Sequence, residues 1–206
     1  MRPILVGFAG GSGSGKSTLV QALVASMGDQ CAHVVHDRYY RSLTAEQLQD
    51  VSAVNFDEPD ALDNARCVAD LNKMIIDGGA ALPVYDFKTH RRVSEEWVPA
   101  RPLILVEGIL VFAYPALRSA LDVRIFIDTP ESVRLHRRIQ RDIVCRGRTE
   151  SEVTARFWDT VAPMHEAHVA PTLMDAHLVV DGTAPVAESV LLVTRFIRGL
   201  VSESRP

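Results

Sequence analysis

The sequence predicts an α/β fold in which five short parallel strands form one sheet covered by helices on both faces. Five apolar runs of three to six residues have the length and composition of buried strands. They cover residues 4–9, 32–35, 103–106, 123–127 and 178–180. The segments between them have features of helices, and such alternation of strands and helices is typical of a parallel sheet.

Length and composition favour a single folded domain over residues 1–206. The chain has 47% hydrophobic and 23% charged residues, which is ordinary for a protein with one core. A net charge of -4 argues against broad nucleic-acid binding. The longest apolar run, residues 103–117, contains Glu107 and Pro115 and is too short to span a bilayer. We therefore expect neither a nucleic-acid nor a membrane partner.

The N-terminus lacks the basic region and apolar stretch of a signal peptide. Cys31, Cys67 and Cys145 are odd in number and have no paired spacing. We therefore expect a cytoplasmic protein with free thiols.

A glycine-rich stretch connects the first predicted strand to the first predicted helix. Gly10, Gly15, Lys16 and Ser17 match the P-loop pattern G-x-x-x-x-G-K-[ST]. Glycines let backbone N–H groups point at a phosphate, and the following helix adds positive potential. A flexible linker is the alternative, but the flanking strand and helix favour a nucleoside triphosphate site. Lys16 is expected to reach the terminal phosphates and the Ser17 hydroxyl to ligate Mg²⁺.

Three further side chains are candidates for the site. Asp37 ends the second predicted strand, and ligands in open α/β sheets bind at the carboxyl ends of strands. We therefore expect it to face the phosphate site rather than only to cap a helix. Asp57 precedes Pro59 in a polar loop, where a structural turn acid and a functional acid are equally consistent. His90, in a basic turn, is by itself typical of a surface residue.

The middle of the chain has signals for two helices and a hairpin. Thr44 and Gln47 have the spacing of a capping box for a short helix. Asp60 is the expected N-cap of a helix over residues 60–77, which Gly78 would end. Residues 82–98 contain two β-rich runs around a polar turn, which predicts an antiparallel hairpin.

A basic helix lies between the fourth and fifth predicted strands. Arg134, Arg137, Arg138 and Arg141 fall on one helical stripe, and two more arginines follow at positions 146 and 148. A solvated face paired with acids is the usual interpretation of such a stripe, but the arginines outnumber the nearby acids. In a P-loop protein the surplus suits binding of polyphosphate and neutralisation of a moving phosphoryl group.

Beyond the P-loop, a series of motifs resembles those of uridine–cytidine kinases in order and spacing. The most specific are Asn-Phe-Asp-x-Pro-Asp-Ala at residues 55–61 and Val-Tyr-Asp-Phe-x-x-His at residues 84–90. His-Asp-Arg-Tyr-Tyr at 36–40, Glu-Gly-Ile-Leu at 107–110, Arg-Asp-Ile at 141–143 and Arg-Gly-Arg at 146–148 complete the set. The resemblance extends over about residues 3–182.

The resemblance implies roles for the matching residues. Lys16, Asp37 and Arg141 would be catalytic, with Asp37 as the general base. The phosphate donor, ATP or GTP, would contact Gly11, Ser12, Gly13, Ser14, Gly15, Lys16, Ser17, Thr18, Arg146 and Arg148. The nucleoside would contact Asp37, Tyr40, Phe56, Asp57, Tyr85, Phe87, His90 and Arg138. Mg²⁺ would lie near Ser17, Asp37 and Glu107.

Within the nucleoside set, Asp57 resembles the carboxylate that holds the ribose hydroxyls. Tyr85, Phe87 and His90 resemble the hairpin residues that contact the pyrimidine. The resemblance also implies the sheet order 2-3-1-4-5, a substrate-side hairpin over residues 80–100 and an arginine-rich lid over residues 131–175. A homo-oligomer, either a tetramer or a dimer, is expected on the same basis.

The implied reaction is phosphorylation of the 5′-hydroxyl of uridine and cytidine to UMP and CMP, as in pyrimidine salvage. His36, Arg38 and Arg156 depart from the family pattern and leave the substrate preference open. One alternative is a related kinase for phosphoribulose, pantothenate or a nicotinamide nucleoside. The other is a non-catalytic nucleotide-binding regulator, although the chain has no Asn-Lys-x-Asp guanine motif.

Overall fold

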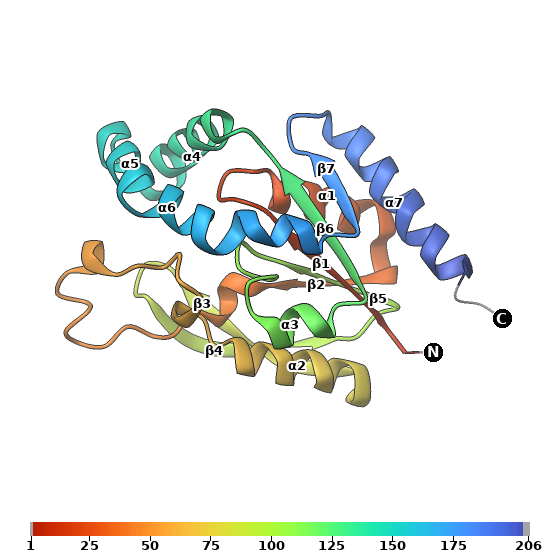
Figure 1. Cartoon of the computed structure of the whole chain (residues 1–206). Coiled ribbons are helices and arrows are strands. Elements are labelled where there is room, and N and C mark those ends of the chain that lie inside the picture. The colour runs from red at the N-terminus through yellow and green to blue at the C-terminus, as the bar shows by residue number, and fades with distance from the viewer. Residues whose placement is uncertain (1, 204–206) are drawn as a thin grey trace.

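The strand β1 (Ile4–Ala9) lies at the centre of the sheet. In the computed structural model, which describes residues 2–203, β1 pairs in parallel with β5 (Leu103–Glu107) and with β6 (Val123–Asp128). The outer strands are β2 (Cys31–Val35) beside β5 and β7 (Leu178–Asp181) beside β6 (Figure 1). The predicted α/β fold with a five-stranded parallel sheet is confirmed.

The strand order across the sheet is β2-β5-β1-β6-β7. These numerals differ from the expected 2-3-1-4-5 because the expectation numbered only the strands of the sheet, whereas the hairpin strands here take the numbers β3 and β4. The register places both Phe8 of β1 and Val35 of β2 opposite Glu107 of β5. The loops that follow these three strands therefore start at the same edge of the sheet, where α/β proteins bind ligands.

Helices cover both faces of the sheet. They are α1 (Lys16–Met27), α2 (Asn64–Asp77), α3 (Pro115–Ala120), α4 (Glu131–Arg146), α5 (Glu150–Arg156), α6 (Ala162–Met164) and α7 (Val186–Glu203). Successive side chains of a strand point to opposite faces. Val6 and Phe8 accordingly pack in the core shared with α1 and α7, whereas Leu5 and Ala9 belong to the core shared with α2, α3 and the hairpin.

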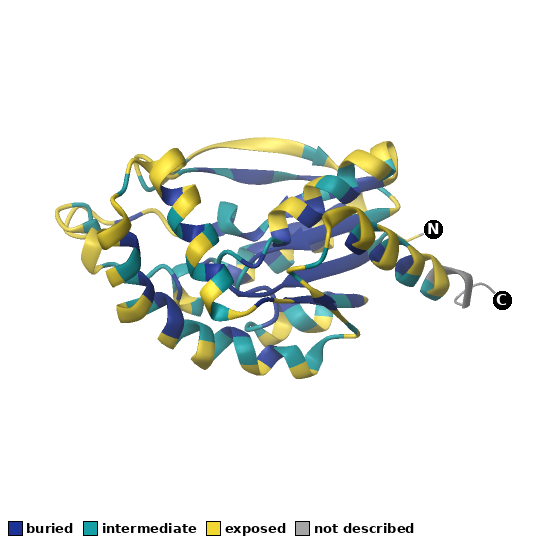
Figure 2. Ribbon diagram, turned by 90° about the horizontal axis from the view of Figure 1, so that it is seen from above, coloured by how far each residue is buried: buried dark blue, intermediate teal, exposed yellow. Residues whose placement is uncertain are grey.

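The predicted hairpin is confirmed and consists of β3 (Gly79–Asp86) and β4 (Arg91–Pro99). The register shifts between Val84 and Tyr85, which pair with Ser94 and Arg92, so the extra residue of the bulge is Val93 of β4, just after the turn. β3 is largely buried against the core, whereas β4 is the exposed outer strand (Figure 2). The hairpin thus presents one end to the ligand edge of the main sheet.

The prediction that Asp60 caps the second helix is wrong. α2 begins at Asn64, and the Asp63 carboxylate accepts a hydrogen bond from the Arg66 backbone N–H at 3.2 Å. Residues Pro59–Ala61 instead form a separate 3-10 turn, and Leu62 is extended between the two elements. Because Leu62 is extended, the helix cannot continue from the 3-10 turn, and Asp63, directly before Asn64, becomes the N-cap.

The expected helix after Thr44 is also absent, although its hydrogen bonds form. The Thr44 backbone N–H donates to Gln47 Oε1 at 2.9 Å, and the Gln47 backbone N–H donates to Thr44 Oγ1 at 3.2 Å. The segment that follows is an exposed turn. Helices gain most of their stability from packing an apolar face, so a cap alone does not propagate one here.

Residues 131–175, which we call the arginine segment, contain the helices α4, α5 and α6. Gly147, in the left-handed conformation with φ 63°, ends α4, and a capping box of Thr149 and Glu152 begins α5. Two π-helical turns, Phe157–Val161 and His165–Val169, flank α6. None of the helices within residues 2–203 combines the length and apolarity that a membrane span requires.

Two positions on α2 test how the core between the sheet, α2, α3 and the hairpin is stabilised. Leu71 is fully buried, whereas Ile76 is 80% exposed. Leu71→Ala should lower the free energy of unfolding by about 2–5 kcal/mol because it leaves a cavity. Ile76→Ala, the matched control on the same helix, should change it by less than about 0.5 kcal/mol. Urea denaturation measures both, and equal effects would contradict this account of the core.

Candidate active site

The P-loop between β1 and α1 has the backbone conformation that its glycines predict. Gly13 and Gly15 have φ of 83° and 96°, a region that side chains with a Cβ rarely adopt. A Cβ on Gly13 would also collide with the Arg134 carbonyl oxygen of α4. The loop therefore packs directly against the arginine segment.

Lys16 and Ser17 occupy the first turn of α1. The buried Lys16 ammonium donates to the Gly11 carbonyl at 3.0 Å and lies 3.5 Å from Ser14 Oγ. Burial lowers the pKa of Lys16 to about 8, and the neighbouring carboxylates Glu107 and Asp37 oppose this shift. The Ser17 hydroxyl donates to Glu107 Oε2 at 2.9 Å. Lys16 is thus directed at the centre of the loop, as predicted for a phosphate-binding lysine.

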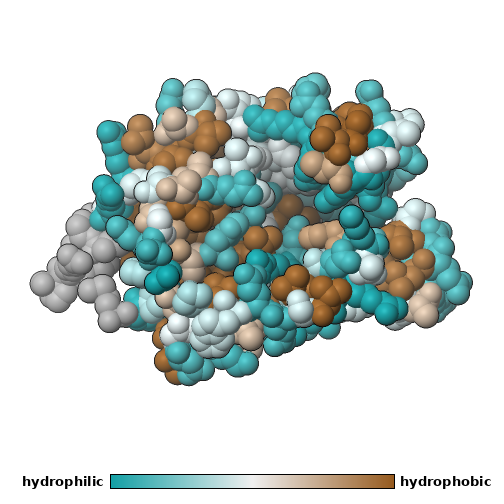
Figure 3. All heavy atoms as spheres, turned by 180° about the vertical axis from the view of Figure 1, so that it is seen from behind, coloured by the Kyte–Doolittle hydropathy of each residue, from teal (hydrophilic) through white to brown (hydrophobic). Residues whose placement is uncertain are grey.

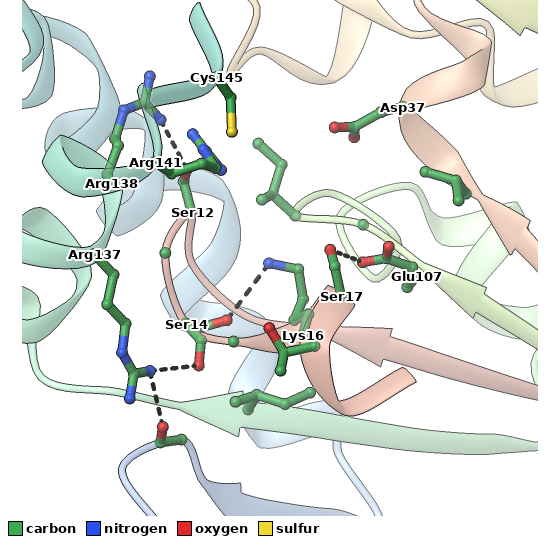
Figure 4. Close-up of a pocket in the computed structure, with 18 of the residues that line it drawn as sticks. Ser12, Ser14, Lys16, Ser17, Asp37, Glu107, Arg137, Arg138, Arg141 and Cys145 are labelled. Carbon is green, nitrogen blue, oxygen red and sulfur yellow. Dashed lines mark hydrogen bonds between the residues drawn. The ribbon is translucent and has the colours of Figure 1, made fainter. Parts of the chain in front are cut away.

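Glu107, at the end of β5, is an ionised carboxylate despite its burial. Burial by itself raises its pKa, but the nearby His33 imidazole, the charge of Lys16 and the hydrogen bond from Ser17 outweigh that effect, so the pKa is lowered. His33 Nε2 lies 3.7 Å from Glu107 Oε1. Glu107 therefore supplies a fixed negative charge beside Ser17, as Figure 4 shows.

Asp37 follows β2, in the short 3-10 helix His36–Tyr39. Its pKa is raised to about 6, first by burial and then by the negative charge of Glu107, while Lys16 acts in the opposite direction. Asp57 and Arg146 also influence it. Asp37 therefore belongs to one electrostatic cluster with the P-loop lysine and can exchange a proton near neutral pH.

An aromatic compartment lies beyond Asp37. Tyr40 has its ring centroid 5.5 Å from that of Phe56, 5.6 Å from that of Tyr85 and 6.4 Å from that of Phe87. The ring of His90 stacks on Phe56 at 5.3 Å with an interplanar angle of 25°. These residues come from three separate segments of the chain, and the fold brings together the aromatic residues that the sequence motifs singled out.

Two polar atoms of the compartment are buried without a hydrogen-bond partner in the structure. They are Tyr85 Oη and His90 Nδ1. His90 is also the one non-glycine residue with positive φ among the described residues, at 52°. Buried polar groups normally have a partner, so these two atoms are available to a polar ligand in the compartment.

Asp57 is buried beside the compartment, with 9% of its surface exposed. Burial raises its pKa, against the opposing charges of Arg138, Arg156, Arg146 and Arg141. A buried carboxylate next to several guanidinium groups is a strong hydrogen-bond acceptor, so the functional alternative for this residue fits the structure better than a simple turn acid.

The arginine segment contacts the P-loop through α4. Arg138 Nη1 donates to Ser12 Oγ at 2.8 Å (Figure 4). Arg137 Nη1 donates to the Ser14 carbonyl at 3.3 Å and to the Gly182 carbonyl at 2.9 Å. The predicted basic stripe thus packs on the phosphate-binding loop rather than forming a purely solvated face.

A cleft of about 1470 Å³ joins these parts. Every residue predicted for the site lines it except Gly11, which packs closely against α4: a Cβ on Gly11 would come within 2.6 Å of Arg134 Nη1. Seen from behind, the surface is hollowed between two lobes (Figure 3). One lobe belongs to the arginine segment and the other to the hairpin and the loop before α2, so the cleft has one side formed by the P-loop and α4 and another formed by the aromatic compartment.

Sequence reasoning missed three residues of the site. Arg137 was grouped with the stripe but not assigned to the P-loop contact, which only the packing of α4 reveals. Asp142, within the Arg-Asp-Ile motif at residues 141–143, was given no role, yet it lies buried among four arginines, and its spacing of four residues from both Arg138 and Arg146 was the available signal. Arg156 donates to the Val54 carbonyl at 2.7 Å and lies 6.0 Å from the Phe56 ring centroid. Its departure from the family pattern was the available signal.

The other two departures from the pattern have structural partners. His36 is fully buried, and its Nε2 lies 3.0 Å from Asn64 Oδ1. Arg38 forms an ion pair with Glu96 of the hairpin at 2.9 Å. Neither side chain lines the cleft, so both hold neighbouring segments in place around the site and do not face a ligand in it.

Comparisons with known proteins agree with this geometry. Residues 5–187 match the model of the phosphoribulokinase / uridine kinase family. A uridine kinase of Chloroflexus aurantiacus is 43% identical over 182 residues, which cover 87% of each chain. A uridine kinase of Clostridium novyi is 35% identical over 207 residues, covering 100% of each chain.

A solved structure shares the fold. A possible uridine kinase from Bacillus stearothermophilus superimposes with a TM-score of 0.62 at 19% identity, covering 88% of this chain and 90% of that chain. At that identity the likeness concerns the fold alone. The family match over most of the sequence and the identities of the curated relatives decide membership: this chain belongs to the phosphoribulokinase / uridine kinase family.

Proposed function

We propose that the protein transfers the terminal phosphoryl group of ATP or GTP to the 5′-hydroxyl of uridine and cytidine. The observation that carries the proposal is the position of Asp37 in the cleft. Its charge is coupled to Lys16 and Glu107 on the nucleotide side and to Asp57 and Tyr40 on the nucleoside side. A relative named uridine kinase aligns over 87% of this chain and 87% of its own length. A dimeric or tetrameric assembly in the cytoplasm stays a prediction from the sequence.

The oxygen atoms at the carboxyl edge of the sheet fit Mg²⁺. The Ser17 hydroxyl and the Asp37 and Glu107 carboxylates are the hard donors that this ion prefers. Among the described residues, no three His, Cys, Asp or Glu side chains form a metal centre by themselves. Kinase Mg²⁺ sites typically use one or two carboxylates together with substrate phosphates and water. When bound, Mg²⁺ would neutralise charge on the phosphates of the donor.

In this proposal Asp37 accepts the proton of the 5′-hydroxyl as the oxygen attacks phosphorus. Its pKa of about 6 leaves it ionised at neutral pH but basic enough to take a proton late in the step. Lys16 and the arginines stabilise the negative charge that spreads over the transferring group. Alignment of the two substrates on either side of Asp37 supplies much of the remaining acceleration.

The nucleoside side of the cleft supports a pyrimidine nucleoside as acceptor. Aromatic rings contact either pyrimidine equally well, and neutral His90 offers one donor and one acceptor nitrogen to the base edge. Burial, aided by Arg148, lowers the pKa of His90, which favours that neutral form. An acceptor such as phosphoribulose has no base to fill this compartment, which favours a nucleoside over that alternative.

Release of ADP with a panel of acceptors tests the function. Uridine and cytidine should be turned over, and adenosine and guanosine should not. The 2′-deoxy analogues should lose about ten- to a hundredfold in kcat/KM because a ribose hydroxyl no longer pairs with Asp57. Lys16→Ala should abolish turnover. Equal rates on uridine and adenosine, or on cytidine and 2′-deoxycytidine, would contradict the proposed recognition.

Asp37→Asn should separate activity from stability. Removing the base should lower kcat by at least about 10² and change nucleoside affinity much less. A raised carboxyl pKa means that folding loses stability as pH rises from about 4 through 6, since the partly desolvated carboxyl group must then ionise in the folded protein. The variant should therefore gain at most about 3 kcal/mol of stability at pH 8 and about half of that at pH 5.

Denaturation at pH 5 and pH 8 measures this gain, with the exposed Asp77→Asn as the matched control. The same protonation should reduce wild-type kcat as the pH is lowered through about 6. A variant that is less stable than the wild type at pH 8 would contradict the raised pKa of Asp37, and one in which only KM changes would remove Asp37 from the role of base.

His90→Asn tests base recognition without straining the backbone. Asparagine tolerates positive φ better than alanine does, and it removes the ring that stacks on Phe56. We expect kcat/KM for uridine and cytidine to fall about tenfold or more, and KM for ATP to change little. The exposed neighbour Arg91→Ala is the control. Unchanged kinetics on both pyrimidines would refute this role for His90.

A further inference from the structure

The carboxylate of Asp142 is the common partner of four arginines around the C-terminus of α4. Arg141 Nε donates to Asp142 Oδ1 at 2.8 Å. Asp142 Oδ2 lies 3.5 Å from Arg146 Nη1, 3.6 Å from Arg148 Nη1 and 3.7 Å from Arg138 Nε. The Asp142 side chain is fully buried by these contacts. One acid therefore holds together four guanidinium groups that all line the cleft.

The main chain of Asp142 fixes the same region. Its carbonyl accepts hydrogen bonds from the backbone N–H groups of Gly147 and of Arg148, the latter at 3.2 Å. The left-handed Gly147, with φ 63°, turns the chain back at this point. The segment that carries Arg146 and Arg148 is thus folded onto Asp142 by both its backbone and its side chain.

The charges of this cluster do not balance. Burial alone would raise the pKa of Asp142, but hydrogen bonding with Arg141 and the charges of Arg146 and Arg138 keep it lowered, so the group is ionised. One negative charge faces four positive ones at contact distance. Guanidinium groups this close repel one another, and in a partly desolvated site the repulsion is stronger than in water. Without the carboxylate, the arginines would separate toward solvent.

Apart from the exposed Glu152 of α5, whose charge interacts with Arg148, the other acids that act on the cluster lie across the cleft. Asp57 influences Arg138, and Asp37 influences Arg146. Both belong to the nucleoside side and, in the proposed reaction, both have other partners. Asp142 is thus the acid in contact with these arginines that has no other partner in the proposed reaction.

We propose that Asp142 is a positioning residue that holds these four arginines in the converging arrangement needed for phosphoryl transfer. The inference rests on the proposed function, since the arginines are taken to act on the donor phosphates and the nucleoside. Asp142 contacts neither substrate in this proposal. It acts through the arginines by offsetting their mutual repulsion before the phosphates arrive, which is a form of electrostatic preorganisation.

Asp142→Asn keeps the shape of the side chain and removes its charge. We expect kcat for uridine phosphorylation to fall about tenfold or more, with smaller changes in KM for ATP and uridine, because the P-loop and the aromatic compartment still bind the substrates. Asp142→Glu restores the charge and should recover most of the lost kcat. Asp159→Asn makes the same chemical change at an exposed position of the arginine segment and should leave kcat unchanged.

Limited proteolysis with trypsin gives a readout that does not require turnover. Trypsin cleaves after arginine, so release of Arg141, Arg146 and Arg148 should speed cleavage at these positions in Asp142→Asn by about fivefold or more relative to Asp159→Asn. Mass spectrometry locates the cuts, and the assay is run well below the melting temperature of each variant. The two proposals can fail separately. If the wild type phosphorylates no nucleoside but Asp142→Asn is still cleaved faster at these arginines, the proposed function is refuted and the role of Asp142 in holding the arginines is still supported.

Wild-type kcat together with a wild-type cleavage pattern in Asp142→Asn would overturn the inference. A loss of activity that Asp142→Glu does not recover, and that a fall in melting temperature fully accompanies, would also overturn it, because Asp142 would then be a residue of general stability only. Faster cleavage confined to the arginine positions, with a kcat loss that glutamate recovers, supports it.

Discussion

The desolvated charges at the carboxyl edge of the sheet are the interaction on which the rest of the site depends. Lys16, Asp37 and Glu107 follow or end three different strands, and the parallel register brings them to one place. Burial moves the pKa values of Lys16 and Asp37 toward neutrality, whereas the neighbouring His33, the charge of Lys16 and the hydrogen bond from Ser17 keep the pKa of Glu107 low. Groups of this kind tolerate burial only when they compensate one another. The strand register therefore directly determines the chemistry of the site.

The distribution of charge matters more here than its sum. The chain is acidic overall, with a net charge of -4, yet several arginines line the cleft. The buried Asp142 contacts four of them, and Asp57, beside the aromatic compartment, also experiences their charge. The result is a local positive field of the kind that concentrates anionic ligands, embedded in a protein that is otherwise negative.

The two sides of the cleft are also linked mechanically. Arg156 of α5 donates to the carbonyls of Ser52 and Val54 at 3.2 Å and 2.7 Å. Its guanidinium lies over Phe56, whose ring stacks on His90 of the hairpin turn. The arginine segment, the loop before α2 and the hairpin thus share one set of contacts, so a shift of the segment would reach the aromatic compartment as well as the P-loop.

The sequence by itself determined the elements and the type of chemistry. Apolar runs, a P-loop pattern with flanking strand and helix, and strand-end acids are local signals, so they predicted the sheet, the hairpin and the positions of Lys16, Ser17 and Asp37. Local signals were insufficient where competing short-range geometries were close in energy, as for Asp60 against Asp63 and for the turn after Thr44. The tertiary structure alone decided which arginine meets the P-loop, because a contact such as that of Arg138 with Ser12 depends on how α4 packs on the loop. The partners of Asp142 lie within six residues of it, so their spacing was visible in the sequence, but only the structure showed that its carboxylate is fully buried and shared by four arginines.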